Sequence, residues 1–131
     1  MFEKVKNFVE RHRNDSINRE IVKEYRKVIW REINGILCEI ENSLNEWENM
    51  INELYQKIIE FDGHFNRAEW IRSMNIVYGV MKRTAVHRRV LNEAQMIFPH
   101  ESRISSINKR LTYCEKNLVS VYHLMDLLDL V

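Results

Sequence analysis

The sequence has 131 residues, a formal net charge of +1 and 45% hydrophobic residues. This length suits one domain with its own core, and regular apolar spacing along the chain argues against disorder. The nearly neutral charge gives no general argument for binding nucleic acid or a membrane. A single proline and three glycines favour a few long helices.

The first predicted helix covers residues 2–13 and is short and amphipathic. Its apolar residues recur at helical spacing: Phe2, Val5, Phe8 and Val9. The polar cluster at 14–16 follows, and its side-chain oxygens can cap the free N–H groups of the next helix.

The second predicted helix covers residues 16–61 and contains two conflicting signals. Its large apolar residues alternate in steps of three and four, the a/d pattern of a packed helix: Trp30, Ile33, Leu37, Ile40, Leu44, Trp47, Ile51, Leu54, Ile58 and Phe61. The Asn34-Gly35 pair inside this pattern is a strong turn signal, and 43–46 resembles a second capping box. Two architectures therefore stay open. Either the helix breaks at 34–35, or it is unbroken and residues 1–29 extend past a three-helix core or fold back on it as a fourth layer.

The third and fourth predicted helices cover residues 66–98 and 102–130. Asn66 begins a capping box with Glu69, and Pro99 ends the third helix. The fourth helix repeats the strict apolar spacing: Ile104, Ile107, Leu111, Cys114, Leu118, Val121, Met125 and Leu128. Its last residues, 124–131, hold more apolar side chains than one apolar seam, the a/d side of a packed helix, can bury. Part of them could therefore serve self-association.

Together these elements predict an all-α antiparallel helical bundle of four helices, in a single domain covering 1–131. Residues 1–29 are a possible extending arm of that domain. Eight positions should be mostly buried: Leu44, Trp47, Ile51, Leu54, Ile107, Leu111, Leu118 and Val121. Cys38 and Cys114 both lie in apolar registers and look like small core residues.

Charge is segregated along the chain. Residues 32–62 carry eight acids and one Lys, whereas 63–110 carry nine Lys or Arg and three acids. The basic cluster is the candidate binding site for phosphate or a protein partner: Lys82, Arg83, His87, Arg88, Arg89, Arg103 and Arg110. Three explanations stay open, namely pairing with the acidic second helix inside the domain, an acidic protein partner, and nucleic acid. The acids between 39 and 53 are interpreted as a solvated face.

Catalysis and metal binding have little support in the sequence. No two of the five histidines are three or four residues apart, so no helix offers a histidine pair to a metal. There is no nucleophile elbow and no glycine-rich phosphate loop. We therefore predict a protein that is not an enzyme and that has no metal and no cofactor.

In size, helix lengths, frequent Asn and Ile and missing catalytic motifs, the chain resembles small helical-bundle proteins of crenarchaeal viruses of the two-tailed type. The resemblance implies a virion component or a protein that binds a host protein. It assigns no functional residues.

The leading hypothesis is a non-enzymatic interaction or assembly protein, encoded by a virus, that binds copies of itself or a host protein. The alternative is a nucleic-acid-binding module that uses the basic third helix. No apolar run is long enough to span a membrane, so the expected location is the host cytoplasm or the virion.

Overall fold

The computed structural model describes residues 3–12, 19–61 and 66–129, and all regular structure in these ranges is α-helical, as predicted. The helices are α1 (Glu3–His12), α2 (Arg19–Ile59), α3 (Arg67–Ile97) and α4 (Ser102–Asp129). The expected caps at 14–16 and the expected helix end at 62–63 lie outside the described residues.

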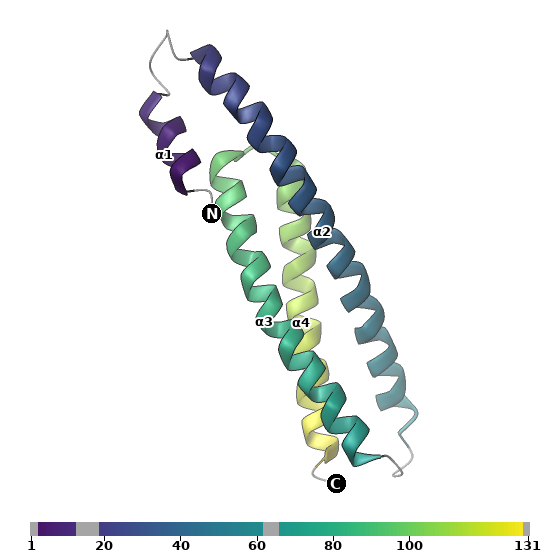
Figure 1. Cartoon of the computed structure of the whole chain (residues 1–131). Helices are drawn as coiled ribbons and strands as arrows, with labels where there is room; N and C mark the ends of the chain where they lie inside the picture. Colours follow the sequence, from purple (N-terminus) through teal and green to yellow (C-terminus); the bar gives the residue numbers. More distant parts are fainter. Residues whose placement is uncertain (1–2, 13–18, 62–65, 130–131) are drawn as a thin grey trace.

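The predicted four-helix bundle is wrong, because the bundle within the described residues has three helices. The contiguous core is built by α2, α3 and α4 together with Phe98. The ten residues of α1 span only about 15 Å. This short helix lies at one end of the bundle, where it contacts α2 and α3 (Figure 1).

Helix α2 is continuous through both possible break points, at 34–35 and at 43–46. A glycine inside a helix costs only about 1 kcal/mol. The seam on either side buries Ile33, Leu37 and Ile40, each about 1% exposed. Burial of one such side chain contributes about 1.5–3 kcal/mol. The apolar pattern therefore outweighs the local turn signal.

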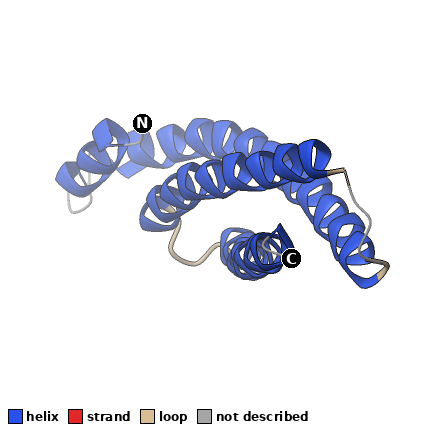
Figure 2. Cartoon of the chain, turned by 90° about the horizontal axis from the view of Figure 1, so that it is seen from below, coloured by secondary structure: helices blue, strands red, loops and turns tan. Residues whose placement is uncertain are grey.

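The central helix of the bundle is α4, which packs closely against both α2 and α3, whereas α2 and α3 approach each other at fewer points. Two side-chain contacts fix the direction of α2 relative to α4. Arg103 of α4 bonds Glu41 of α2, and Arg110 of α4 bonds Glu48 of α2. Both partners advance by seven residues from the first contact to the second, so the two helices run in the same direction. Helices α2 and α4 are therefore parallel, and α3 is antiparallel to both (Figures 1 and 2).

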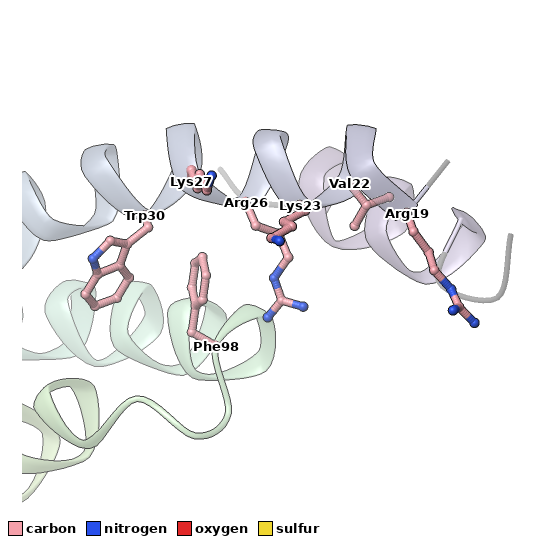
Figure 3. A pocket seen from close by; sticks show the side chains of 7 residues that line it. All are labelled: Arg19, Val22, Lys23, Arg26, Lys27, Trp30 and Phe98. Carbon is pink, nitrogen blue, oxygen red and sulfur yellow. The ribbon is translucent and has the colours of Figure 1, made fainter. Parts of the chain in front are cut away.

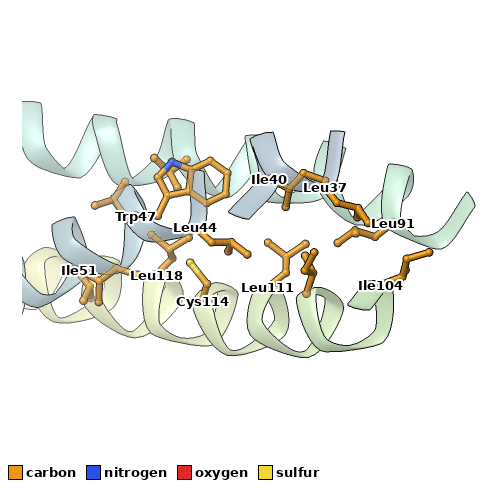
Figure 4. Packing of buried hydrophobic residues seen from close by; sticks show 14 of the residues in the cluster. Leu37, Ile40, Leu44, Trp47, Ile51, Leu91, Ile104, Leu111, Cys114 and Leu118 are labelled. Carbon is orange, nitrogen blue, oxygen red and sulfur yellow. The ribbon is translucent and has the colours of Figure 1, made fainter. Parts of the chain in front are cut away.

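The core confirms all eight predicted buried positions, each of which is at most 6% exposed. Figure 4 shows that Leu44 of α2 lies among Leu111, Cys114 and Leu118 of α4, whereas the Trp47 ring lies toward α3. The ends of the predicted seam are less enclosed, because Trp30 and Ile58 are only partly buried.

The helix ends follow the sequence signals. The Asn66 side chain accepts a hydrogen bond from the Glu69 N–H at 3.2 Å, as a capping residue should. At the other end of α3, the Phe98 N–H donates to the Ala94 carbonyl at 2.9 Å, and Pro99 follows. The Trp70 indole N–H donates to the Met125 carbonyl at 3.0 Å, which joins the first turn of α3 to the last turns of α4.

The N-terminal turns of α2 extend beyond the start of α4. Arg103, the second residue of α4, lies at the level of Asn34 and Glu41. The turns of α2 before Trp30 therefore have no α4 beside them (Figure 1). There α2 meets the end of α3, where the Arg26 guanidinium donates to the Ile97 carbonyl at 2.8 Å.

Candidate interaction surfaces

The predicted basic cluster is divided between the surface and the helix interfaces. Lys82, Arg83 and Arg89 are exposed on α3. The Lys82 ammonium lies 4.7 Å from the ring centroid of Tyr78, a cation–π contact on the same helix. These three cations are the part of the cluster that faces solvent.

Arg88 links α3 to α4. One of its guanidinium nitrogens donates to the Asn108 carbonyl at 3.2 Å and to the Asn108 side chain. The other donates to the Thr112 hydroxyl at 2.7 Å and to the Glu115 carboxylate at 3.1 Å. With these partners, Arg88 acts within the bundle.

Arg103 and Arg110 link α4 to α2. Arg103 bonds Glu41 at 2.7 Å, and Arg110 donates to both oxygens of Glu48 at 2.7 and 2.9 Å. The α2 partners of the two arginines follow steps of four and three: Asn34, Cys38, Glu41, Asn45 and Glu48. This polar edge beside the apolar seam resembles the flanking ion pairs of a parallel coiled coil.

Cys38 corrects one expectation from the sequence. It is exposed on this polar edge, where its sulfur lies 3.3 Å from Arg103, and so it is not a core residue. Cys114 is buried as expected, and burial raises the pKa of its thiol to about 11. Both cysteines are free thiols.

His87 lies between α3 and α2, stacked on Trp47 with ring centroids 5.3 Å apart. Burial lowers the pKa of His87, and the nearby Arg83 lowers it further, whereas Glu39 acts in the opposite direction. The neutral imidazole therefore fills the space between the two helices at neutral pH. His87 serves packing in this arrangement, rather than joining the exposed cations of α3.

A glutamate stripe on α2 was missed as a unit by the sequence analysis. Five exposed glutamates are spaced seven residues apart, four of them in α2 and the last in the turn that follows it: Glu32, Glu39, Glu46, Glu53 and Glu60. Glu39 lies two residues, about 200°, around the helix from Glu41, which faces α4. The glutamate stripe is thus on the flank of α2 opposite to α4. Its constant spacing was visible in the sequence.

The α4 outer stripe has the opposite charge. It consists of residues at steps of four and three, all exposed: Lys109, Tyr113, Lys116, Ser120, His123 and Leu127. Tyr113 is 69% exposed and Leu127 is 48% exposed, so the stripe combines cations with apolar surface. This outcome agrees with the expectation that part of the apolar residues after 124 stays outside the core.

A groove of about 470 Å³ lies where the N-terminal turns of α2 pass the end of α3 (Figure 3). Its floor includes Val22 and the rings of Trp30 and Phe98, which meet edge to face at 5.2 Å. Its described lining also holds four cations and no carboxylate: Arg19, Lys23, Arg26 and Lys27. The sequence did not reveal this groove, because Phe98 comes from another helix end.

Other site types find no support in the described part of the chain. Across residues 3–12, 19–61 and 66–129, no three His, Cys, Asp or Glu side chains are grouped as a metal site would require. None of the described helices contains an apolar stretch that could cross a bilayer. The chain matches no known protein family, no curated protein and no solved structure.

Proposed function

We propose that this chain is a non-enzymatic assembly protein whose copies associate through the glutamate stripe of α2 and the α4 outer stripe. The observation that carries the proposal is the regular row of four exposed glutamates, seven residues apart along α2, which Glu60 continues just beyond the helix end. Seven residues of helix advance about 10.5 Å, so the row presents negative charge at a constant axial interval.

The α4 outer stripe matches this row in spacing and in charge. Lys109 and Lys116 are also seven residues apart and exposed, with His123 after another seven. The glutamate stripe lies on the flank of α2 that faces away from α4. The two stripes cannot meet within one molecule, and a second copy is the partner that supplies the complementary stripe.

Contact between two different stripes is a heterologous interface, which leaves one free stripe at each end of a pair. Such an interface continues into a chain of molecules unless its geometry closes a ring. Exposed ion pairs contribute only about 0–1 kcal/mol each, so burial of Tyr113 and Leu127 must supply much of the affinity. The charges set the register, and they make the association sensitive to salt.

The alternative, in which the basic α3 binds nucleic acid, is weakened by the contacts of three arginines. Arg88, Arg103 and Arg110 each have a carboxylate partner on a neighbouring helix. This leaves Lys82, Arg83 and Arg89 exposed on α3. The origin of the chain in a virus stays a prediction, as do its absence of catalysis and its location in host cytoplasm or virion.

Size-exclusion chromatography with light scattering tests the proposal. We expect the average mass to rise with protein concentration at about 50 mM salt and to fall towards the monomer at about 1 M salt, where the Debye length is about 3 Å. The variant Lys109→Glu/Lys116→Glu removes the cations of the α4 outer stripe and should stay monomeric.

The matched control is Lys82→Glu/Arg89→Glu, which makes the same change in net charge on α3 and should associate like the wild type. Two results would contradict the proposal: a wild-type protein that is monomeric at all concentrations in low salt, or equal loss of association in both variants.

A further inference from the structure

We infer that the groove between the N-terminal turns of α2 and the end of α3 binds single-stranded nucleic acid, with cations on the phosphates and a base against Trp30. This inference goes beyond the proposed self-association, because it concerns a different surface and a different partner. The groove lies at the projecting end of α2, away from the Lys109 and Lys116 side chains that the assembly uses.

The cations of the groove are arranged along one side of a single helix. Arg19, Lys23 and Lys27 are exposed at intervals of four residues, so they recur about every 6 Å along α2. A row of cations beside a groove is how proteins follow the backbone of a single strand. Lys27 also pairs with Glu24 at 3.0 Å, but this pair is exposed and therefore weak.

Arg26 is the cation of the groove that is already engaged. Its guanidinium donates to the Ile97 carbonyl at 2.8 Å and lies 5.2 Å from the centroid of the Phe98 ring. Arg26 thereby fixes the position of Phe98, whose ring forms an edge-to-face pair with Trp30 (Figure 3). The aromatic end of the groove is held in place before any ligand arrives.

Trp30 distinguishes a single strand from other anions. Its ring lines the groove and is only partly buried, so a flat base can stack where the ring is open. A free phosphate has no base, and a duplex keeps its bases stacked inside. A volume of about 470 Å³ lies in the range of ligand pockets, about 300–1,000 Å³. The absence of carboxylates in the described lining also disfavours a basic partner.

The intrinsic fluorescence of Trp30 can report binding in the groove. Trp47 and Trp70 are 4% and 7% exposed, so Trp30 is the tryptophan that a ligand in this groove can reach. Titration with an oligothymidylate of about 15 nucleotides at about 50 mM salt should quench the fluorescence of Trp30. Fluorescence anisotropy of a labelled oligonucleotide gives the affinity independently, at protein concentrations where light scattering shows a monomer.

The variant Arg19→Ala/Lys23→Ala should weaken binding at least tenfold and flatten the salt dependence of log K by about 1.4, or about 0.7 for each phosphate contact. The control Lys82→Ala/Arg89→Ala loses the same charge on α3 and should bind like the wild type. Trp30→Leu, with helicity checked by circular dichroism, should remove the quenching and weaken binding about fivefold or more.

Four results would overturn the inference. They are no binding of the oligonucleotide at about 50 mM salt, equal losses in the groove variant and the control, preference for a duplex of the same length, and equal binding of polyglutamate. The last result would instead assign the groove to an acidic protein segment.

Discussion

Replacing Gly35 by Ala tests whether α2 is a single helix. Gly35 is exposed in the middle of α2, and no atom lies within 4 Å of the position that an added Cβ would occupy. The change therefore meets no steric obstacle. It removes the flexibility that a glycine gives to the unfolded chain and improves the helix propensity at this position.

The expected gain in the free energy of unfolding is about 0.5–1 kcal/mol, the usual difference between Gly and Ala inside a helix. For a chain of this length, that gain raises the melting temperature by about 2–4 °C. Urea titration followed by circular dichroism at 222 nm measures it, and the slope with denaturant should stay unchanged.

Gly79→Ala is the matched control, because Gly79 also lies inside a helix and has no atom within 4 Å of the added Cβ. Both variants should be stabilised to a similar degree. A Gly35→Ala protein that is less stable than the wild type, beside a stabilised Gly79→Ala, would place a turn at Gly35 and refute the continuous α2.

Further variants test the core, the thiols and the buried imidazole. Leu118→Ala should cost about 2–5 kcal/mol in urea titration, because Leu118 is 0% exposed, whereas Leu127→Ala should change stability by less than about 1 kcal/mol. In the folded protein, iodoacetamide should label Cys38 and spare Cys114, whose thiol is buried and has its pKa raised to about 11; mass spectrometry after digestion locates the label, and early labelling of Cys114 would contradict the buried site. Because folding lowers the pKa of His87, the unfolded state binds a proton more readily, so stability should fall as pH drops from about 7 to 5. His87→Gln should show a shallower fall over that window, and an unchanged slope would contradict the lowered pKa.

The apolar pattern was sufficient to predict helices and most of the core, but it left open whether the second helix is continuous. Residues such as Leu44 and Leu118 lie at steps of three and four that a local turn signal does not interrupt, and they are fully buried. The number of helices in the bundle was harder to predict. The amphipathic spacing at 2–13 shows that a helix can form, but it does not show whether so short a helix joins the core.

Tertiary structure decides which charged side chains bond another helix and which face solvent. Arg88 and Arg89 are neighbours in the sequence, yet Arg88 bonds Asn108, Thr112 and Glu115 on α4 and Arg89 faces solvent. A rotation of about 100° between adjacent residues of a helix decides which of them meets the next helix. Cys38 shows the same limit, because its register permits burial but the parallel α4 places Arg103 beside it.

The groove could not be predicted from the sequence either, because its lining combines residues from distant parts of the chain. Its cations and Trp30 belong to one stretch of α2, but Phe98 follows α3, far away in the sequence. The contact forms because α3 ends at the level of Trp30. In contrast, the glutamate stripe needs no tertiary information, and a search for seven-residue repeats of charge would have found it.

Mixing two charge-reversed variants tests the proposed assembly most directly. Lys109→Glu/Lys116→Glu makes the α4 outer stripe negative, and Glu46→Lys/Glu53→Lys makes part of the glutamate stripe positive. Each variant alone repels its own copies and should be monomeric by light scattering at about 50 mM salt. An equimolar mixture pairs opposite charges at both stripes, so we predict that association returns. A mixture that stays monomeric, while the wild type associates under the same conditions, would contradict the account.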